Sequence, residues 1–211
     1  MLKEIYEKLD VYRKQITPFV ELSEIEKKQE ELGIKFPDRM VEFYQYFGND
    51  NAILSADYIF DKLEDIRIED NALCIGYMEQ LGARLGIKLM DLGTKSPSIC
   101  YKRKNQDIWF NEEGADIIFF FRAACWQIMI SMQGVARTEM SENQFKKLIG
   151  EGFNYLNDQK LFLLSPVIPV VAEDILGCYL VRDGLLYLGT NKEDDVLEEF
   201  EEKFDLDLDW L

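Results

Sequence analysis

The sequence predicts an α+β fold in which a mostly antiparallel central sheet is flanked by helices. Apolar residues recur at helical spacing up to residue 48, short runs with strand character follow from 52 to 110, and helical patterns return before a late hairpin. The chain of 211 residues, 47% hydrophobic and 30% charged, is long enough to bury one substantial core. We therefore expect residues 1–211 to form a single domain, in which an N-terminal helical extension (1–22) precedes the core (23–211).

Two helices are predicted before residue 33. The apolar residues of the first recur at helical spacing, and we expect this helix to end near Thr17-Pro18. In the second, Ser23 and Glu26 have the spacing of a capping box, in which each side chain bonds the backbone N–H of the other residue. Gly33 is suited to end this helix in a left-handed conformation.

A third helix is predicted within the stretch LGIKFPDRMVEFYQYFGN, residues 32–49. Pro37 fits the first helical turn, where its missing N–H costs no hydrogen bond, and Gly48 closes the helix. The apolar face of this helix consists of Met40, Val41, Phe43, Tyr44 and Phe47.

The middle of the chain predicts strands and then two helices. Short apolar runs between Ala52 and Phe110 are separated by Gly, Pro and Asn turns, which is typical of a sheet. A buried helix is predicted over 115–132. Another helix is predicted to begin at Ser141, which can form a capping box with Gln144.

The end of the chain predicts a hairpin, a helix and a strand. The runs 175–181 and 185–188 flank Arg182-Asp183-Gly184, in which the Asp-Gly pair suits a tight two-residue turn. Asn191 is a suitable N-cap for the last helix. From 204 to 210 apolar residues alternate with aspartates, as in a strand with one buried face.

The composition excludes several classes of active site, because the chain contains no histidine. A Ser-His-Asp or Cys-His nucleophile, an imidazole base and a His-ligated metal are all impossible. The four cysteines are far apart and never occur as Cys-x-x-Cys, so we expect reduced core residues. We expect no metal, no cofactor and no catalytic residue. The alternative is an enzyme that uses a carboxylate or a cysteine for catalysis.

The net charge of −16 bears on the partners of the chain. The electric field of such a negative charge repels nucleic-acid phosphates and anionic lipids and favours a basic protein partner. The alternative is that the charge only keeps the protein soluble. The first residues do not predict a secretion signal, and the apolar run 117–121 is too short to span a bilayer. We therefore expect a cytoplasmic protein that binds neither nucleic acid nor membrane directly, and the oligomeric state stays open.

The stretch LGIKFPDRMVEFYQYFGN resembles the SUKH superfamily, where a Leu-Gly-x-x-Leu/Phe-Pro connector leads into a helix rich in Phe and Tyr that ends at Gly. The later segment LCIGYMEQLGARLGIKLMDL is similar to a second family segment through Gln80, Gly86 and Ile87, and differs from it at Glu79, Leu81 and Leu85. The resemblance covers residues 23 to 210 and implies a non-enzymatic α+β domain. It implies a bacterial immunity protein that neutralises a polymorphic toxin by binding it, or a regulatory or scaffold module with another partner.

The last nineteen residues carry ten acidic residues and a single base, Lys203. We hypothesise that this segment turns its apolar side to the sheet and its acidic side to a toxin's cationic cleft, with a solvated helix face as the alternative reading. The candidate contacts in this segment are Asp194, Asp195, Glu198, Glu201 and Glu202. Trp109 and Trp210 are candidate interface anchors, and core positions are the alternative for both.

Overall fold

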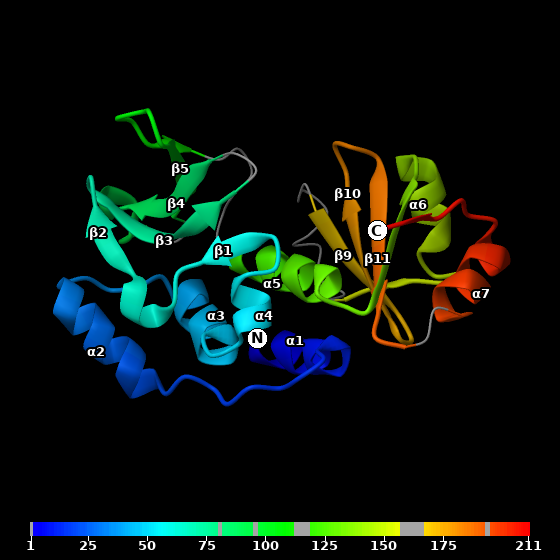
Figure 1. The fold of residues 1–211 in the computed structure, drawn as a ribbon, viewed down its shortest axis with the longest axis horizontal. Coiled ribbons are helices and arrows are strands. Elements are labelled where there is room, and N and C mark those ends of the chain that lie inside the picture. The colour runs from blue at the N-terminus through cyan, green and yellow to red at the C-terminus, as the bar shows by residue number, and fades with distance from the viewer. Residues whose placement is uncertain (1, 80–81, 95–96, 112–118, 157–166, 193–194) are drawn as a thin grey trace. The chain divides into compact units, whose positions relative to one another are not determined.

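The computed structural model describes residues 2–79, 82–94, 97–111, 119–156, 167–192 and 195–211. It contains helices and two antiparallel sheets, which confirms the predicted α+β class (Figure 1). The prediction of one central sheet is wrong, because the strands are divided between two sheets. The chain forms two compact units, one made mainly of residues 16–127 and one of residues 3–15 and 128–211. That residues 1–211 make one domain stays a prediction.

The predicted helices of the 16–127 unit occur in the predicted order with shifted ends, and one short helix is an addition to them. The helices are α2 (Leu22–Leu32), α3 (Asp38–Phe47), the short, additional α4 (Asn51–Leu54) and most of α5 (Phe119–Ile130). The predicted capping box at Ser23 is wrong, because Glu21 occupies the N-cap and Ser23 lies inside the first turn. Gly33 does end α2 with φ of 67°, whereas Pro37 is the N-cap of α3 instead of its first residue.

The sheet of this unit has the order β1-β3-β4-β5-β6, with β2 also paired to β3. Helix α4 interrupts the region predicted as strands, because the carboxylate of Asp50 accepts hydrogen bonds from two of its backbone N–H groups. Aromatic side chains join α3 and α5 to the sheet, as the ring of Phe43 lies 4.9 Å from that of Phe60 and 5.4 Å from that of Phe120. The strands are β1 (Tyr58–Phe60), β2 (Arg67–Glu69), β3 (Ala72–Met78), β4 (Ala83–Lys88), β5 (Ile99–Arg103) and β6 (Phe110–Asn111).

The second unit is built on the sheet β12-β7-β11-β10-β9-β8. Its strands are β7 (Gly134–Glu139), β8 (Asn154–Tyr155), β9 (Val167–Ala172), β10 (Ile175–Leu180), β11 (Leu185–Thr190) and β12 (Asp209–Trp210). Its helices are α1 (Leu2–Leu9), α6 (Glu142–Leu148) and α7 (Asp195–Phe204). Buried side chains of α6 and α7 share one core cluster with side chains of β9, β10 and β11. Both helices lie on the same side of this sheet (Figure 1).

Local signals in this unit are partly confirmed. The capping box of Ser141 and Gln144 is present. The hairpin β10–β11 is also present, but Leu180 pairs with Leu185, so four residues form the turn instead of two, and Gly184 has φ of 65°. The first helix ends at Leu9 and continues only as a 3-10 turn to Tyr12, short of Thr17-Pro18.

Two predictions near the chain end are corrected. The side chain of Asn191, expected to cap α7, donates instead to the carbonyl oxygen of Tyr12 at 2.6 Å. The terminal strand is limited to β12, where Asp209 pairs with Arg137 and Trp210 with Ala136. The residues before it form the end of α7 and a connector, because Asp205 adopts φ of 50° and turns the chain out of the helix.

Candidate partner-binding surface

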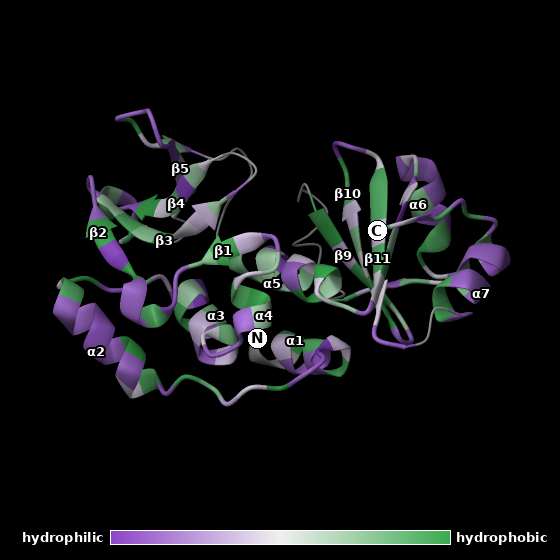
Figure 2. Ribbon diagram, in the orientation of Figure 1, coloured by the Kyte–Doolittle hydropathy of each residue, from purple (hydrophilic) through white to green (hydrophobic). Residues whose placement is uncertain are grey.

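Six exposed carboxylates line the outer side of α7 and the connector that follows it. We call them the acidic face: Asp195, Glu198, Glu199, Glu202, Asp205 and Asp207. Figure 2 shows hydrophilic residues along most of α7. Within the part of the chain that the structure describes, none of the six forms an ion pair, so their charge is directed to solvent.

The acidic face is held in place by the opposite side of α7. Leu197 is fully buried and Phe200 is 8% exposed, and both belong to the core cluster of the sheet. The ring of Phe200 lies 4.8 Å from that of Phe153 and 4.6 Å from that of Phe204. Helical spacing of the apolar residues therefore fixes which carboxylates face outward, as the sequence predicted.

Glu201 differs from its acidic neighbours because it is part of the fold. It is half-buried, and its Oε1 accepts a hydrogen bond from the backbone N–H of Leu208 at 2.7 Å. The carbonyl of Glu201 also accepts from the N–H of Leu206 at 3.0 Å. Glu201 was predicted as a partner contact, and the structure gives its carboxylate a role in fixing the connector to β12.

The other predicted contact residues have different positions. Asp195, Glu198 and Glu202 belong to the acidic face, whereas Asp194 lies outside the described residues. Trp210 is 42% exposed at the end of the chain, beside Leu211, which is 63% exposed. These two side chains add exposed apolar surface at and just after β12, the strand that follows the acidic face in the sequence.

Trp109 is a core residue, which corrects its assignment as an interface anchor. It is 9% exposed and clusters with Ala72, Cys74 and Cys100. Gly86 lies between the two cysteines in the register of β3, β4 and β5, and a Cβ atom there would lie 3.1 Å from the indole ring. The missing side chain of Gly86 thus makes room for Trp109 in the 16–127 unit.

A hollow of about 360 Å³ lies where the connector after α7 meets β7 and α6. Asp205 and Asp207 of the acidic face line it, together with Glu139 and Glu151, and Lys147 is the base on its wall. A hollow with this excess of carboxylates suits a lysine or arginine side chain from a partner. Sequence reasoning missed it, because its walls are distant in the sequence.

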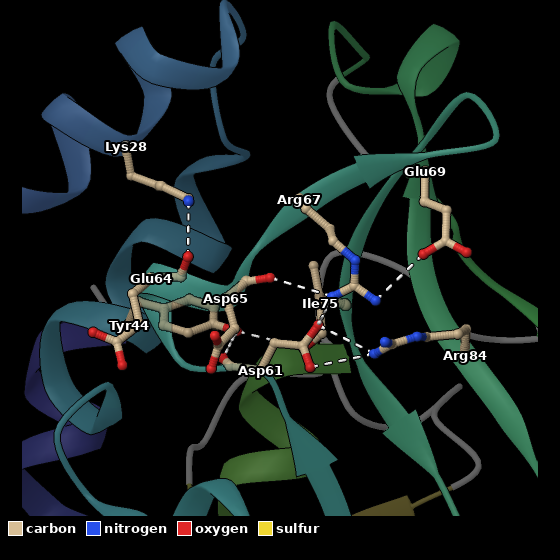
Figure 3. A network of polar contacts seen from close by, with 9 residues as sticks. All are labelled: Lys28, Tyr44, Asp61, Glu64, Asp65, Arg67, Glu69, Ile75 and Arg84. Carbon is tan, nitrogen blue, oxygen red and sulfur yellow. Dashed lines mark hydrogen bonds and ion pairs between the residues drawn. The ribbon is translucent and has the colours of Figure 1, made fainter.

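A second polar cluster lies in the 16–127 unit, around Asp61 (Figure 3). Burial raises the pKa of Asp61, although Arg84 and Arg67 lie 3.4 and 3.7 Å from its carboxylate and lower it. The hydroxyl of Tyr44 donates to the carbonyl of Asp61 at 2.8 Å, and burial raises the pKa of Tyr44 well above its usual range. These contacts tie α3, β2 and β4 to the segment after β1, which is a structural role.

The cysteines are poorly suited to nucleophilic chemistry. All four are buried, and none of them forms a disulfide. Burial raises the pKa of Cys74 to about 11 and that of both Cys100 and Cys178 to about 12, so these thiols stay protonated near neutral pH. Among the described residues, no group of three or more acidic or cysteine side chains is arranged to hold a metal ion.

Comparisons of the chain with protein-family models, curated proteins and solved structures found no match. The resemblance to the SUKH superfamily therefore stays a prediction. None of the helices in the described ranges combines the length and apolar content needed to cross a bilayer.

Proposed function

We propose that this chain is an immunity protein that binds a bacterial polymorphic toxin in the cytoplasm and neutralises it by covering its basic active site. The observation that carries the proposal is the acidic face: four exposed carboxylates on α7 and two on the connector after it, none with an ion-pair partner among the described residues, on an element whose other side is anchored in a core. A negative surface speeds and orients the encounter with a positive cleft, because complementary charges attract over a distance. A surface held in place by a core also loses little conformational entropy on binding.

The surroundings of the acidic face supply the other parts of an interface. The hollow beside Asp205 and Asp207 is large enough for a basic side chain. Trp210 and Leu211 provide apolar surface that a partner can cover, and tryptophan is enriched among residues that dominate binding energies. Affinity in this proposal comes from shape and charge, without covalent chemistry, metal or cofactor.

The proposal is tested by co-expressing the chain with the toxin encoded beside it and measuring bacterial growth. The wild-type chain restores growth, and the triple variant Asp195→Asn, Glu198→Gln, Glu202→Gln restores it less well. A matched control removes three exposed charges from α2 and the residue before it, as Glu21→Gln, Glu26→Gln, Glu30→Gln, and protects like the wild type.

Failure of the wild-type chain to protect, with a different protein recovered in stoichiometric amount from lysate, would support the regulatory or scaffold module instead. Equal protection by the triple variant and its control would leave immunity standing but remove the acidic face from it.

A further inference from the structure

A cavity of about 590 Å³ lies in the 16–127 unit, between α2, the end of α3, the start of α4 and the 3-10 turn Leu63–Asp65. Its volume falls in the range of about 300 to 1,000 Å³ that is typical of small-molecule sites. All residues that line it belong to this one unit, and none of them belongs to the acidic face.

Lys28 is the buried charge of this cavity. Its residue is only 9% exposed, although an ammonium group is costly to remove from water. Its Nζ donates to the carbonyl oxygen of Glu64 at 2.9 Å and to Oε1 of Glu31 at 3.2 Å (Figure 3 shows the first bond). An ammonium group has three N–H donors, so one donor of Lys28 has no partner among the described residues.

Other residues on the wall of the cavity supply hydrogen-bond donors in addition to the third N–H of Lys28. Lys27, Lys62 and Asn51 line the cavity, and all three residues are exposed. With Lys28, the two exposed lysines make three lysines on a wall that also carries three glutamates, in a chain with a net charge of −16. Each of the lysines and Asn51 has side-chain N–H groups that can donate a hydrogen bond to an anion.

Glutamates also line the cavity, but they lie at more exposed positions than Lys28. Glu24 and Glu64 are exposed residues, and the side chain of Glu31 is 62% exposed. Water screens these exposed carboxylates more strongly than it screens the buried ammonium. Among the charged groups on the wall of the cavity, the one that water screens least is therefore the ammonium group of Lys28.

We propose that this cavity binds a small organic anion whose carboxylate or phosphate group accepts a hydrogen bond from Lys28 and is surrounded by Lys27, Lys62 and Asn51. The site is independent of the proposed toxin binding, because it uses other residues.

The test is a titration of the ¹⁵N-labelled full chain, followed by NMR at constant ionic strength, with inorganic phosphate in one series and succinate in the other. We expect saturable shifts at the backbone amides of Gly48 and Asn49 and at the side-chain amide of Asn51. Saturation by phosphate alone or by succinate alone identifies which group the site takes. Shifts that stay linear, or that sodium chloride reproduces, overturn the proposal.

Two variants assign the binding to the lysines. Lys28→Met retains the length of the side chain and weakens binding about tenfold or more, because a charged hydrogen bond is lost. Lys27→Met, Lys62→Met changes only exposed residues and keeps the fold, so its unchanged affinity would overturn the proposal even if Lys28→Met does not fold. Lys104→Met, at an exposed residue that does not line the cavity, is the control and binds like the wild type.

Discussion

The Oε1 atom of Glu201 lies 2.7 Å from the backbone nitrogen of Leu208 and accepts its hydrogen bond. This bond joins α7 to the segment that enters β12, across the turn at Asp205. We expect Glu201→Ala to lower the free energy of unfolding by about 1–2 kcal/mol, because a half-buried N–H loses its acceptor. Glu201→Gln retains an acceptor oxygen and costs less. Urea denaturation measures both, and Glu202→Ala, at an exposed neighbour, is the control; equal losses for the two alanine variants would contradict the assignment.

Gly152 and Phe204 make a second close contact under α7. A Cβ atom at Gly152 would overlap the ring of Phe204, so Gly152→Ala forces the ring out of its position. We expect a loss of about 1–3 kcal/mol in the free energy of unfolding, which is typical of overpacking. Gly93→Ala is the matched control, since a Cβ there meets nothing within 4 Å. If overpacking is the cause, Phe204→Leu in the Gly152→Ala background costs less than the two single changes together.

We expect replacement of Trp109 to affect mainly the stability of the fold, and replacement of Trp210 to affect mainly the binding of the partner. Trp109→Ala removes a large buried ring and lowers the free energy of unfolding by about 3–5 kcal/mol. Trp210→Ala changes a side chain that is 42% exposed, and we expect a loss below about 1 kcal/mol together with weaker binding of the partner. Denaturation curves of the two variants decide the first part. A fully stable Trp109→Ala variant would place this residue outside the core.

The features that could be predicted from the sequence are those that depend on residues close together in the chain. The capping box at Ser141 and the left-handed end of α2 at Gly33 depend on residues within one or two turns, and both are present. The outward direction of the carboxylates on α7 follows from the spacing of its apolar residues. The start of α2 was misplaced because Ser23 and Glu26 match the capping pattern, whereas the helix begins at Leu22.

Features that depend on distant pairing could not be predicted. The division into two sheets rests on pairs such as β7 with β11 and β12, which join strands far apart in the sequence. The burial of Trp109 depends on the register that places Gly86 between Cys74 and Cys100. The structural role of Glu201 depends on the turn at Asp205, which brings Leu208 back to α7. No periodicity in a single sequence contains this information.

We expect the buried thiol of Cys178 to lower the free energy of unfolding at high pH. Burial raises the pKa of its thiol from 9.0 to about 12. Between these values the unfolded chain releases the proton and the folded chain keeps it, so the unfolded state binds fewer protons and stability falls as the pH rises. We expect Cys178→Ala to reduce this fall by roughly 1 kcal/mol per pH unit between pH 9 and 11, as measured by urea denaturation at each pH. Identical slopes for variant and wild type would contradict the raised pKa.

The acidic face predicts how fast a partner binds. Neutralising Asp195, Glu198 and Glu202 removes three exposed charges without touching the core or Glu201, so the free energy of unfolding stays within about 0.5 kcal/mol of the wild type. The association rate with the cognate toxin falls by about tenfold at low salt, because the steering field is weakened, and its dependence on salt becomes flatter.

Stopped-flow measurements over a salt series give both quantities, and the dissociation rate changes less than the association rate. The control that neutralises Glu21, Glu26 and Glu30 removes the same charge from the chain, so it separates a specific surface from the net charge. Equal slowing of both triple variants would assign the effect to the total charge of the chain. An unchanged association rate in the α7 variant, with the toxin still bound, would place the interface elsewhere on the molecule.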